Sequence, residues 1–226
     1  MSGAYAGAAP FQGTPNIAAL LAGFGGRLPT LTDRQYAIDN AVANVRDFGA
    51  TGDGVTSDTA AFEAAFAVSN AIYVPRGAYN VAGLSIAGGR RIRGEDRTLT
   101  TVTGAGDLLL NAGDSAAQGY IGNLALTNGA QTKGKLVTAH IGAVANARVL
   151  FDNVEFGASN YHVYGSDVGG CTCVDWMFLN CRFGGALIVS RYFDYITAYR
   201  EYGCYTWFNA VGLRVLRGEN IKLDGT

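Results

Sequence analysis

The chain has 226 residues, of which 15% are charged and 32 are glycine, and its net charge is −1. An average soluble domain has about 25% charged residues and about 7% glycine, so this chain has few charges with which to cover its surface. Because basic residues are not in excess, binding to a nucleic-acid backbone is not expected. Insertion into a membrane is not expected either, because no uncharged apolar run is long enough to span one. Residues 1–13 lack the basic and hydrophobic segments of a signal peptide.

Cysteine and histidine are too few, and too poorly spaced, to predict a disulfide framework or a metal site. The cysteines all fall late in the chain, at Cys171, Cys173, Cys181 and Cys204. The gap between Cys171 and Cys173 is shorter than zinc ligands usually have. The histidines are His140 and His162, and His162 is expected on the surface. No metal and no other cofactor is predicted.

Residues 1–43 are rich in glycine and alanine and only weakly patterned. Two short helices are predicted, at residues 16–24 and 33–43, with Thr32 or Asp33 capping the second. Neither helix could bury much surface by itself. This segment is therefore expected to dock on something else.

Residues 44–81 predict a small unit built around one helix. A short strand at residues 45–48 leads into a glycine-rich loop, followed by Ser57 and Asp58 as caps of a helix that ends near Ser69. Phe62, Ala65 and Phe66 form its apolar stripe. Two strands follow, at residues 71–74 and 78–81, on either side of a Pro-Arg-Gly turn.

A repeat runs through residues 82–226. In three segments (121–127, 151–157 and 178–184) an Asn is followed by apolar residues at the first and third positions, and a partial fourth copy begins at Asn220. An unmatched copy is expected near residues 199–203. Alternation with a period of two places the apolar pair inside a strand and the middle residue outside. One such strand per repeat predicts a parallel β-helix of roughly six coils.

The aligned positions predict two columns along this β-helix. Asn tolerates left-handed backbone and its amides can bond to one another, so Asn123, Asn153 and Asn180 are interpreted as a structural column at a bend. The outward middle positions are Ala125, Glu155, Arg182 and Lys222. Glu155 and Arg182 are predicted to form a cross-strand ion pair.

Two neighbouring segments resemble the N-terminal motif of pectate-lyase-like right-handed β-helix proteins. They are NVRDFGATGDGVTSDTAAFEAAF at residues 44–66 and IYVPRGAYNV at residues 72–81. That group includes many bacteriophage tailspikes and glycan depolymerases. The resemblance implies an all-β fold: a right-handed parallel β-helix over residues 44–226, with a short helix within residues 44–81 covering its first coil. Asp47, Asp53 and Asp58 are assigned capping and turn roles, because their spacing is not that of a calcium loop. Because the sequence stops directly after a repeat strand, a longer natural β-helix or a covering chain is expected.

The sequence identifies no catalytic residue. Several carboxylates remain unassigned, and none belongs to a paired motif: Asp152, Asp167, Asp175, Asp194 and Glu201. An aromatic run at residues 192–208 is the more suggestive feature, because rings on a flat wall can stack on sugars. Four of its members are the predicted glycan-binding residues: Tyr199, Tyr202, Tyr205 and Trp207. A subunit interface or the core is the alternative role for this run. Tyr161, His162 and Tyr164 form a smaller cluster.

These features lead to three hypotheses. The favoured one is a virion tailspike or tail-fibre protein, assembled in the host cytoplasm, that attaches to other tail or baseplate proteins through residues 1–43. It would bind host-surface polysaccharide as a homotrimer, because three parallel rods could bury their charge-poor walls against one another. The second is a polysaccharide lyase or hydrolase, with its active site on the β-helix wall or beyond residue 226. The third is a purely structural tail assembly protein.

Overall fold

The computed structural model describes residues 42–86, 89–104, 106–111, 119–128, 134–139, 147–165 and 173–224. The chain divides into two units, Met1–Asp39 and Asn40–Thr226, and the second contains all of the described residues. The helices predicted at residues 16–24 and 33–43 lie outside the described residues, except that Ala43 is already in a strand. No helix in the described part of the chain is both long and apolar enough to cross a membrane.

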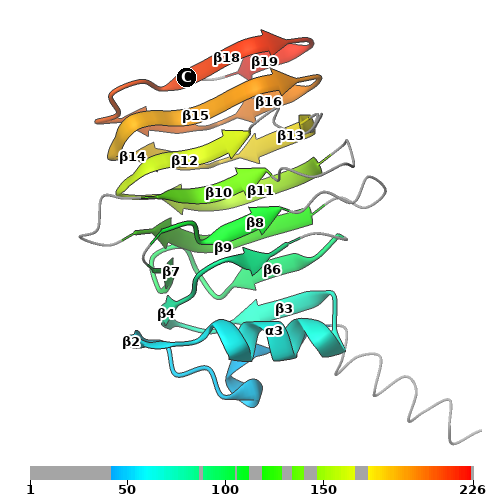
Figure 1. Ribbon diagram of the computed structural model, residues 1–226, viewed down its shortest axis with the longest axis vertical. Helices are drawn as coiled ribbons and strands as arrows, with labels where there is room; N and C mark the ends of the chain where they lie inside the picture. Colours follow the sequence, from blue (N-terminus) through cyan, green and yellow to red (C-terminus); the bar gives the residue numbers. More distant parts are fainter. Residues whose placement is uncertain are drawn as a thin grey trace, which may run out of the picture. The chain divides into compact units, whose positions relative to one another are not determined.

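Strands of successive turns pair in parallel and form three walls (Figure 1). Wall 1 consists of β1 (Ala43–Asn44), β3 (Ala71–Val74), β6 (Arg91–Gly94), the first parts of β9 (Gly119–Thr127) and β11 (Ala147–Phe156), β13 (Cys173–Leu179), β16 (Tyr199–Tyr202) and β19 (Ile221–Asp224). Wall 2 consists of β2 (Asp53–Ser57), β4 (Gly77–Asn80), β7 (Thr100–Thr103), the second parts of β9 and β11, β14 (Arg182–Gly184) and β17 (Tyr205–Trp207). Wall 3 consists of β5 (Leu84–Ser85), β8 (Leu109–Asn111), β10 (Lys135–Ala139), β12 (Ser159–Gly165), β15 (Ala186–Ile196) and β18 (Leu213–Gly218).

The walls wind into a right-handed parallel β-helix. Along wall 1 the chain advances one turn at each pairing, from β3 through β6, β9, β11, β13 and β16 to β19, which makes about six turns in the described part. The parallel β-helix predicted from the repeat is therefore confirmed, as is the right hand that the resemblance implied.

The interior is built from the apolar positions of the alternating pattern. The inward pairs predicted for the three full repeat copies are buried: Leu124 and Leu126, Val154 and Phe156, and Cys181 and Phe183. The pair predicted for the fourth copy, Ile221 and Leu223, is exposed. Side chains of successive turns lie directly on one another. The Phe151 and Phe178 rings stack with centroids 4.8 Å apart, and those of Phe156 and Phe183 stack at 4.7 Å. These columns give the turns one continuous core.

A single residue with left-handed backbone separates wall 1 from wall 2. Asn123, Asn153 and Asn180 have φ angles of 55°, 55° and 52°, and Gly203, with φ 61°, follows at the same place in the next turn. The Asn153 Nδ2 donates to the Asn123 Oδ1 at 2.9 Å. The predicted column is confirmed, and glycine replaces Asn in the turn that the sequence pattern left unmatched.

The fourth copy of the repeat, predicted at Asn220, is wrong. Tyr199 pairs with Ile221, so Asn220 lies just before the wall 1 strand instead of at the bend after it. Asn220 also has left-handed backbone, with φ 54°, which produced the same local pattern at a different place in the turn.

The helix α3 (Thr59–Val68) lies at the β3 end of the solenoid and buries Phe62, Ala65 and Phe66, as predicted (Figure 1). Because it contacts β1, β3 and β5, it covers the first coil. An uncovered end would present a bare core and bare strand edges.

Two local predictions near this helix are wrong. Residues Val45–Phe48 form a 3-10 helix, η1, in which the Arg46 amide donates to the Asn44 Oδ1 at 3.0 Å. Asp58 makes no side-chain bond to α3. Its carboxylate instead accepts from the amides of Thr51 at 2.6 Å and Asn80 at 3.2 Å, because a buried carboxylate needs hydrogen-bond donors. The turn role predicted for Asp53 is confirmed by its bonds to the amides of residues 55 and 56.

One turn carries a buried ion pair inside the solenoid. Arg191 replaces an apolar residue in the inward column of wall 3, after Val163, and Glu201 replaces one in wall 1, after Phe178. The Arg191 Nε lies 2.9 Å from the Glu201 Oε1, and the two residues are 4% and 1% exposed. The Tyr199 hydroxyl donates to the same carboxylate, and burial raises the pKa of this hydroxyl well above its usual range.

His162 lies in the core beside this ion pair, so its predicted surface position is wrong. It packs against the rings of both Phe156 and Phe183, and its Nδ1 lies 2.9 Å from the Ser190 Oγ. The Ser190 hydroxyl also accepts from the Arg191 guanidinium at 3.1 Å. Burial lowers the pKa of His162 to about 3, so the ring is neutral near pH 7.

Candidate functional site: a cationic and aromatic hollow on wall 2

An outward column runs along wall 2 beside the bend. Strand pairing places Ala125, Glu155 and Arg182 side by side, as predicted, and Tyr205 is the next member. The predicted place of Lys222 in this column is wrong. It pairs with Arg200 on wall 1, because the strand after Asn220 belongs to that wall.

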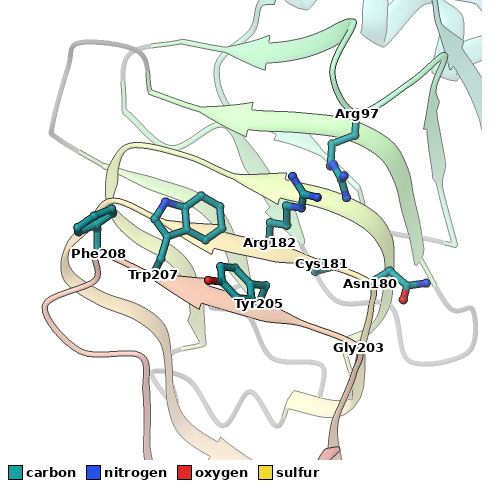
Figure 2. Close-up of a pocket in the computed structure, with 8 residues that line it drawn as sticks. All are labelled: Arg97, Asn180, Cys181, Arg182, Gly203, Tyr205, Trp207 and Phe208. Atoms are coloured by element: carbon teal, nitrogen blue, oxygen red, sulfur yellow. The ribbon is translucent and has the colours of Figure 1, made fainter. Parts of the chain in front are cut away.

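A hollow of about 800 Å³ opens beside this column. Its lining combines guanidinium groups, aromatic rings and small residues: Arg97, Asn180, Cys181, Arg182, Gly203, Tyr205, Trp207 and Phe208. In Figure 2, Arg182 lies between the aromatic side chains and Arg97. None of these residues carries a carboxylate. A ligand in the hollow would meet positive charge and ring faces together.

The rings of the hollow lie against the wall. The Tyr205 and Trp207 ring centroids are 5.8 Å apart, with planes at 36°, and Tyr205 is 66% exposed. Trp207 pairs with Gly184 across β14 and β17. A Cβ atom at position 184 would lie 2.3 Å from the indole Cε2. Glycine at this position therefore leaves the space that the indole occupies.

The two guanidinium groups of the hollow differ in how they are held. Arg97, from the turn between β6 and β7, donates to the Asn153 Oδ1 at 2.7 Å and lies 3.8 Å from the Glu155 carboxylate. Arg182 is exposed and forms no ion pair with any residue that the structure describes. The predicted ion pair between Glu155 and Arg182 is wrong, because Arg97 reaches Glu155 from another turn. Arg182 remains available to a ligand.

The structure brings together only part of the predicted glycan-binding set. Tyr205 and Trp207 line the hollow, whereas Tyr202 is half-buried and does not. Tyr199 is completely buried and packs against Phe178, so it cannot present its ring to a ligand. It occupies an inward position of its strand, which the aromatic composition alone did not reveal.

Arg97 and Phe208 are the residues that sequence reasoning missed. Arg97 lies in a polar turn and is 56 residues away from its partner Asn153, so no local pattern marks it. Phe208 closes the predicted aromatic run and is 90% exposed, a degree of exposure that only the structure shows.

Tyr161, Tyr164 and Tyr192 form an aromatic cluster on wall 3, and their rings contact one another. The Tyr164 and Tyr192 rings stack at 5.0 Å, and Tyr161 meets both edge to face. The Lys135 ammonium lies 4.2 Å from the Tyr164 ring centroid. Tyr192 donates to the Asp194 carboxylate at 2.6 Å, which with burial raises the pKa of Tyr192 to about 12. These ring faces pack on one another and offer little to a sugar.

The carboxylates left unassigned by the sequence do not gather into a pair. Asp152 accepts from Tyr120, Asp175 pairs with Arg200 at 3.3 Å, and Glu201 is buried with Arg191. Asp194 lies on wall 3, and Asp167 lies outside the described residues. Glycoside hydrolysis usually needs two carboxylates that flank the scissile bond. The described carboxylates of this set show no such arrangement.

The described residues contain no group of three His, Cys, Asp or Glu side chains placed to hold a metal ion. Cys173, Cys181 and Cys204 are buried, and burial raises the pKa of the Cys181 thiol well above its usual range. His140 and Cys171 lie outside the described residues.

Comparison with known proteins identifies the family. Residues 42–183 match the family model described as rhamnogalacturonase A/epimerase, pectate lyase-like. The chain belongs to this family. The predicted resemblance to pectate-lyase-like right-handed β-helix proteins is therefore confirmed.

Individual relatives match over limited lengths. The chain is 51% identical over 45 residues to mannuronan C5-epimerase AlgE1 of Azotobacter vinelandii, which covers 18% of this chain and 3% of that protein. The A-module of mannuronan C-5 epimerase AlgE6 from the same organism matches the structure with a TM-score of 0.60 and 18% identity, over 81% of this chain and 57% of that module. The pre-mature bacteriophage phi29 gene product 12 matches with a TM-score of 0.48 and 17% identity, over 86% of this chain and 35% of that one. At these identities the structural matches show the fold alone.

Proposed function

We propose that this protein binds an acidic polysaccharide in the hollow on wall 2. The observation that carries the proposal is the convergence of Arg97 and Arg182 with the rings of Tyr205, Trp207 and Phe208 on one exposed hollow. Aromatic faces stack on sugar rings, and guanidinium groups form charge-assisted hydrogen bonds with carboxylates. A sugar polymer bearing carboxylates satisfies both parts of this lining.

The family supports a polysaccharide ligand. Two of the matching proteins are named as mannuronan epimerases, and the family itself is described by carbohydrate-active enzymes. Binding is favoured over hydrolysis because the described lining residues of the hollow include no carboxylate, and because the nearby Glu155 faces Arg97. We therefore assign recognition to this hollow and leave catalytic residues unassigned.

The proposed setting is a virion spike or fibre, with residues 1–43 as the attachment segment for other tail proteins. Its support is the resemblance of residues 44–81 to the N-terminal motif of pectate-lyase-like right-handed β-helix proteins, a group that includes many bacteriophage tailspikes. The proposed assembly is a homotrimer, because 15% charged residues leave long walls with little charge. Light scattering on the full chain tests this assembly, and a monomer of the correctly folded protein would contradict it.

A titration with defined oligosaccharides tests the binding proposal. Trp176 is fully buried whereas Trp207 lines the hollow, so a change in tryptophan fluorescence reports on this site. We expect oligogalacturonate to change the fluorescence and a neutral gluco-oligosaccharide of equal length to leave it unchanged.

The Arg182→Gln variant should bind oligogalacturonate about tenfold more weakly or worse, because it loses a charge-assisted hydrogen bond. Lys222→Gln removes the same charge from a position on wall 1, away from the hollow, and should stay within about twofold of the parent. The proposal fails if oligogalacturonate does not bind, if the neutral sugar binds equally well, or if both variants lose affinity equally.

A further inference from the structure

We propose a second site for an acidic sugar residue on wall 1, at a hollow of about 440 Å³. This inference rests on the proposed function, because the same class of ligand would occupy both sites. The hollow is lined by Val42, Ala71, Ile72, Arg91, Arg93 and Tyr120. It lies on the other side of the Asn bend from the wall 2 hollow, and nearer the N-terminal end of the solenoid.

The positive charge of this hollow comes from one strand. Arg91 and Arg93 are two positions apart on β6, so both side chains point outward, and both are exposed. Neither forms an ion pair with a carboxylate among the residues that the structure describes. Two unpaired guanidinium groups, held side by side by a strand, are suited to one carboxylate.

The aromatic part of the hollow comes from the next turn. Tyr120 pairs with Arg91, and Gly122 pairs with Arg93. A Cβ atom at position 122 would lie 2.2 Å from the Tyr120 hydroxyl oxygen, so the ring lies across the glycine. The hydroxyl donates to the Asp152 carboxylate at 3.4 Å. Burial and the Asp152 charge raise the pKa of Tyr120, so this hydroxyl stays a hydrogen-bond donor.

The two hollows therefore have the same arrangement of side chains. In each, an aromatic side chain lies across a glycine of the wall, Trp207 across Gly184 and Tyr120 across Gly122, next to two arginines. Neither glycine has a positive φ, so neither is required by backbone conformation. What both glycines provide is the space that lets a ring lie against the wall beside positive charge. The smaller volume on wall 1 fits a shorter segment of the polymer.

Calorimetric titration of the full chain with a galacturonate trimer tests the second site. We expect each chain of the parent protein to bind two molecules of the galacturonate trimer. Arg91→Gln/Arg93→Gln should lower this to one while leaving the Trp207 fluorescence change intact, and Arg182→Gln should weaken the fluorescent site only. Gly122→Ala, which displaces the Tyr120 ring without straining the backbone, should weaken the wall 1 site several-fold.

The matched control is Arg214→Gln/Lys222→Gln, which removes the same charge from exposed positions outside both linings and should keep two trimers per chain. One trimer per chain for the parent, unaffected by Arg91→Gln/Arg93→Gln, would overturn the second site and leave the proposed function standing. One trimer that is lost in Arg91→Gln/Arg93→Gln without a change of Trp207 fluorescence would overturn the wall 2 hollow instead. No binding, or an equal loss in the control, would overturn both.

Discussion

The interior of the solenoid differs between its earlier and later turns. From β6 to β11 the inward column of wall 1 is purely apolar, with Ile92, Ile121 and Phe151 on top of one another. Two turns after Phe151 the same column reaches Glu201, at the level where wall 3 contributes Arg191. A side chain at an inward position of this fold therefore needs neighbours of matching chemistry. Apolar side chains packed on one another meet this need most often, and Arg191 with Glu201 meets it by forming an ion pair.

The turn that contains the Arg191–Glu201 ion pair, called the ionic turn below, is tolerated because the two charged side chains and their other partners lie next to one another. A lone buried charge costs several kcal/mol, whereas Arg191 has Glu201 at 2.9 Å, donates to Thr206 at 3.2 Å and lies 4.1 Å from the Phe183 ring centroid. In the earlier turns, the free energy of unfolding should therefore fall when side-chain volume is removed. In the ionic turn, it should fall when one member of the ion pair is removed.

Truncation of the apolar column should have the largest effect. Phe178→Ala removes a ring that stacks on Phe151 and touches Tyr199, and we expect a loss of about 3–5 kcal/mol in the free energy of unfolding. Urea denaturation measures it. Phe178→Leu, which keeps most of the volume, should cost clearly less, and equal losses would contradict a packing role for the column.

Breaking the ion pair should cost nearly as much. Arg191→Met leaves the buried Glu201 carboxylate without its cation, and we expect a loss of about 3 kcal/mol in the free energy of unfolding, because an unpaired charge remains in the core. The double variant Arg191→Met/Glu201→Leu should recover most of this loss, because it converts the ionic turn into an apolar one. A double variant that is less stable than Arg191→Met would show that the two charges do not depend on each other.

Lowering the pH should reduce the free energy of unfolding through His162, which is buried in the later turns. Its pKa is about 3 in the folded chain against an ordinary value of 6.5, so the unfolded chain takes up a proton first as the pH falls. The stability is therefore complete above pH 6.5 and declines below it, by about 2 kcal/mol at pH 5. His162→Leu removes this proton uptake, so the stability difference between parent and variant should shift by that amount between pH 7.5 and pH 5. A difference that does not change with pH would contradict a neutral buried ring.

The bend that both regions share should show the smallest effect. Asn153→Ala places a residue without a polar side chain at φ 55° and removes the bonds to Asn123 and Arg97, for a loss of about 1–2 kcal/mol. Asn153→Gly removes the same bonds but tolerates the left-handed backbone, as Gly203 does in its own turn, and should therefore lose less stability. Thermal unfolding compares the two variants, and a glycine variant that is the less stable of the two would contradict a conformational role for Asn at this bend.

Much of the fold could be predicted because its signals are local. The alternation around Leu124, Val154 and Phe183 assigned inward and outward positions correctly, and the stripe of α3 predicted its buried face. The same reasoning misplaced Asn220 and His162. Left-handed backbone occurs at more than one place in a turn, and His162 is followed by Val163 and Tyr164, so its inward direction depends on the pairing with β15.

The candidate site was only partly predictable. Tyr205 and Trp207 came from the aromatic run, whereas Tyr199 in the same run lies in the core. Arg182 was identified as an outward residue but given Glu155 as a partner, and Arg97, which takes that partner, was not identified. Such errors follow from turns of unequal length, since residues at the same level are separated by different numbers of residues in the chain.

The sequence by itself determined that this chain forms a parallel β-helix and which positions of the three full repeat copies face inward, because both depend on a period of two that is complete within each strand. The right hand of the β-helix was implied by the resemblance of residues 44–81 to pectate-lyase-like proteins. Only the tertiary structure decided which side chains of different turns lie side by side. The register between turns places Arg191 against Glu201, Arg97 against Glu155, and Tyr120 beside Arg91 and Arg93. These juxtapositions, which depend on the lengths of the loops between strands, create both the ionic turn and the two hollows.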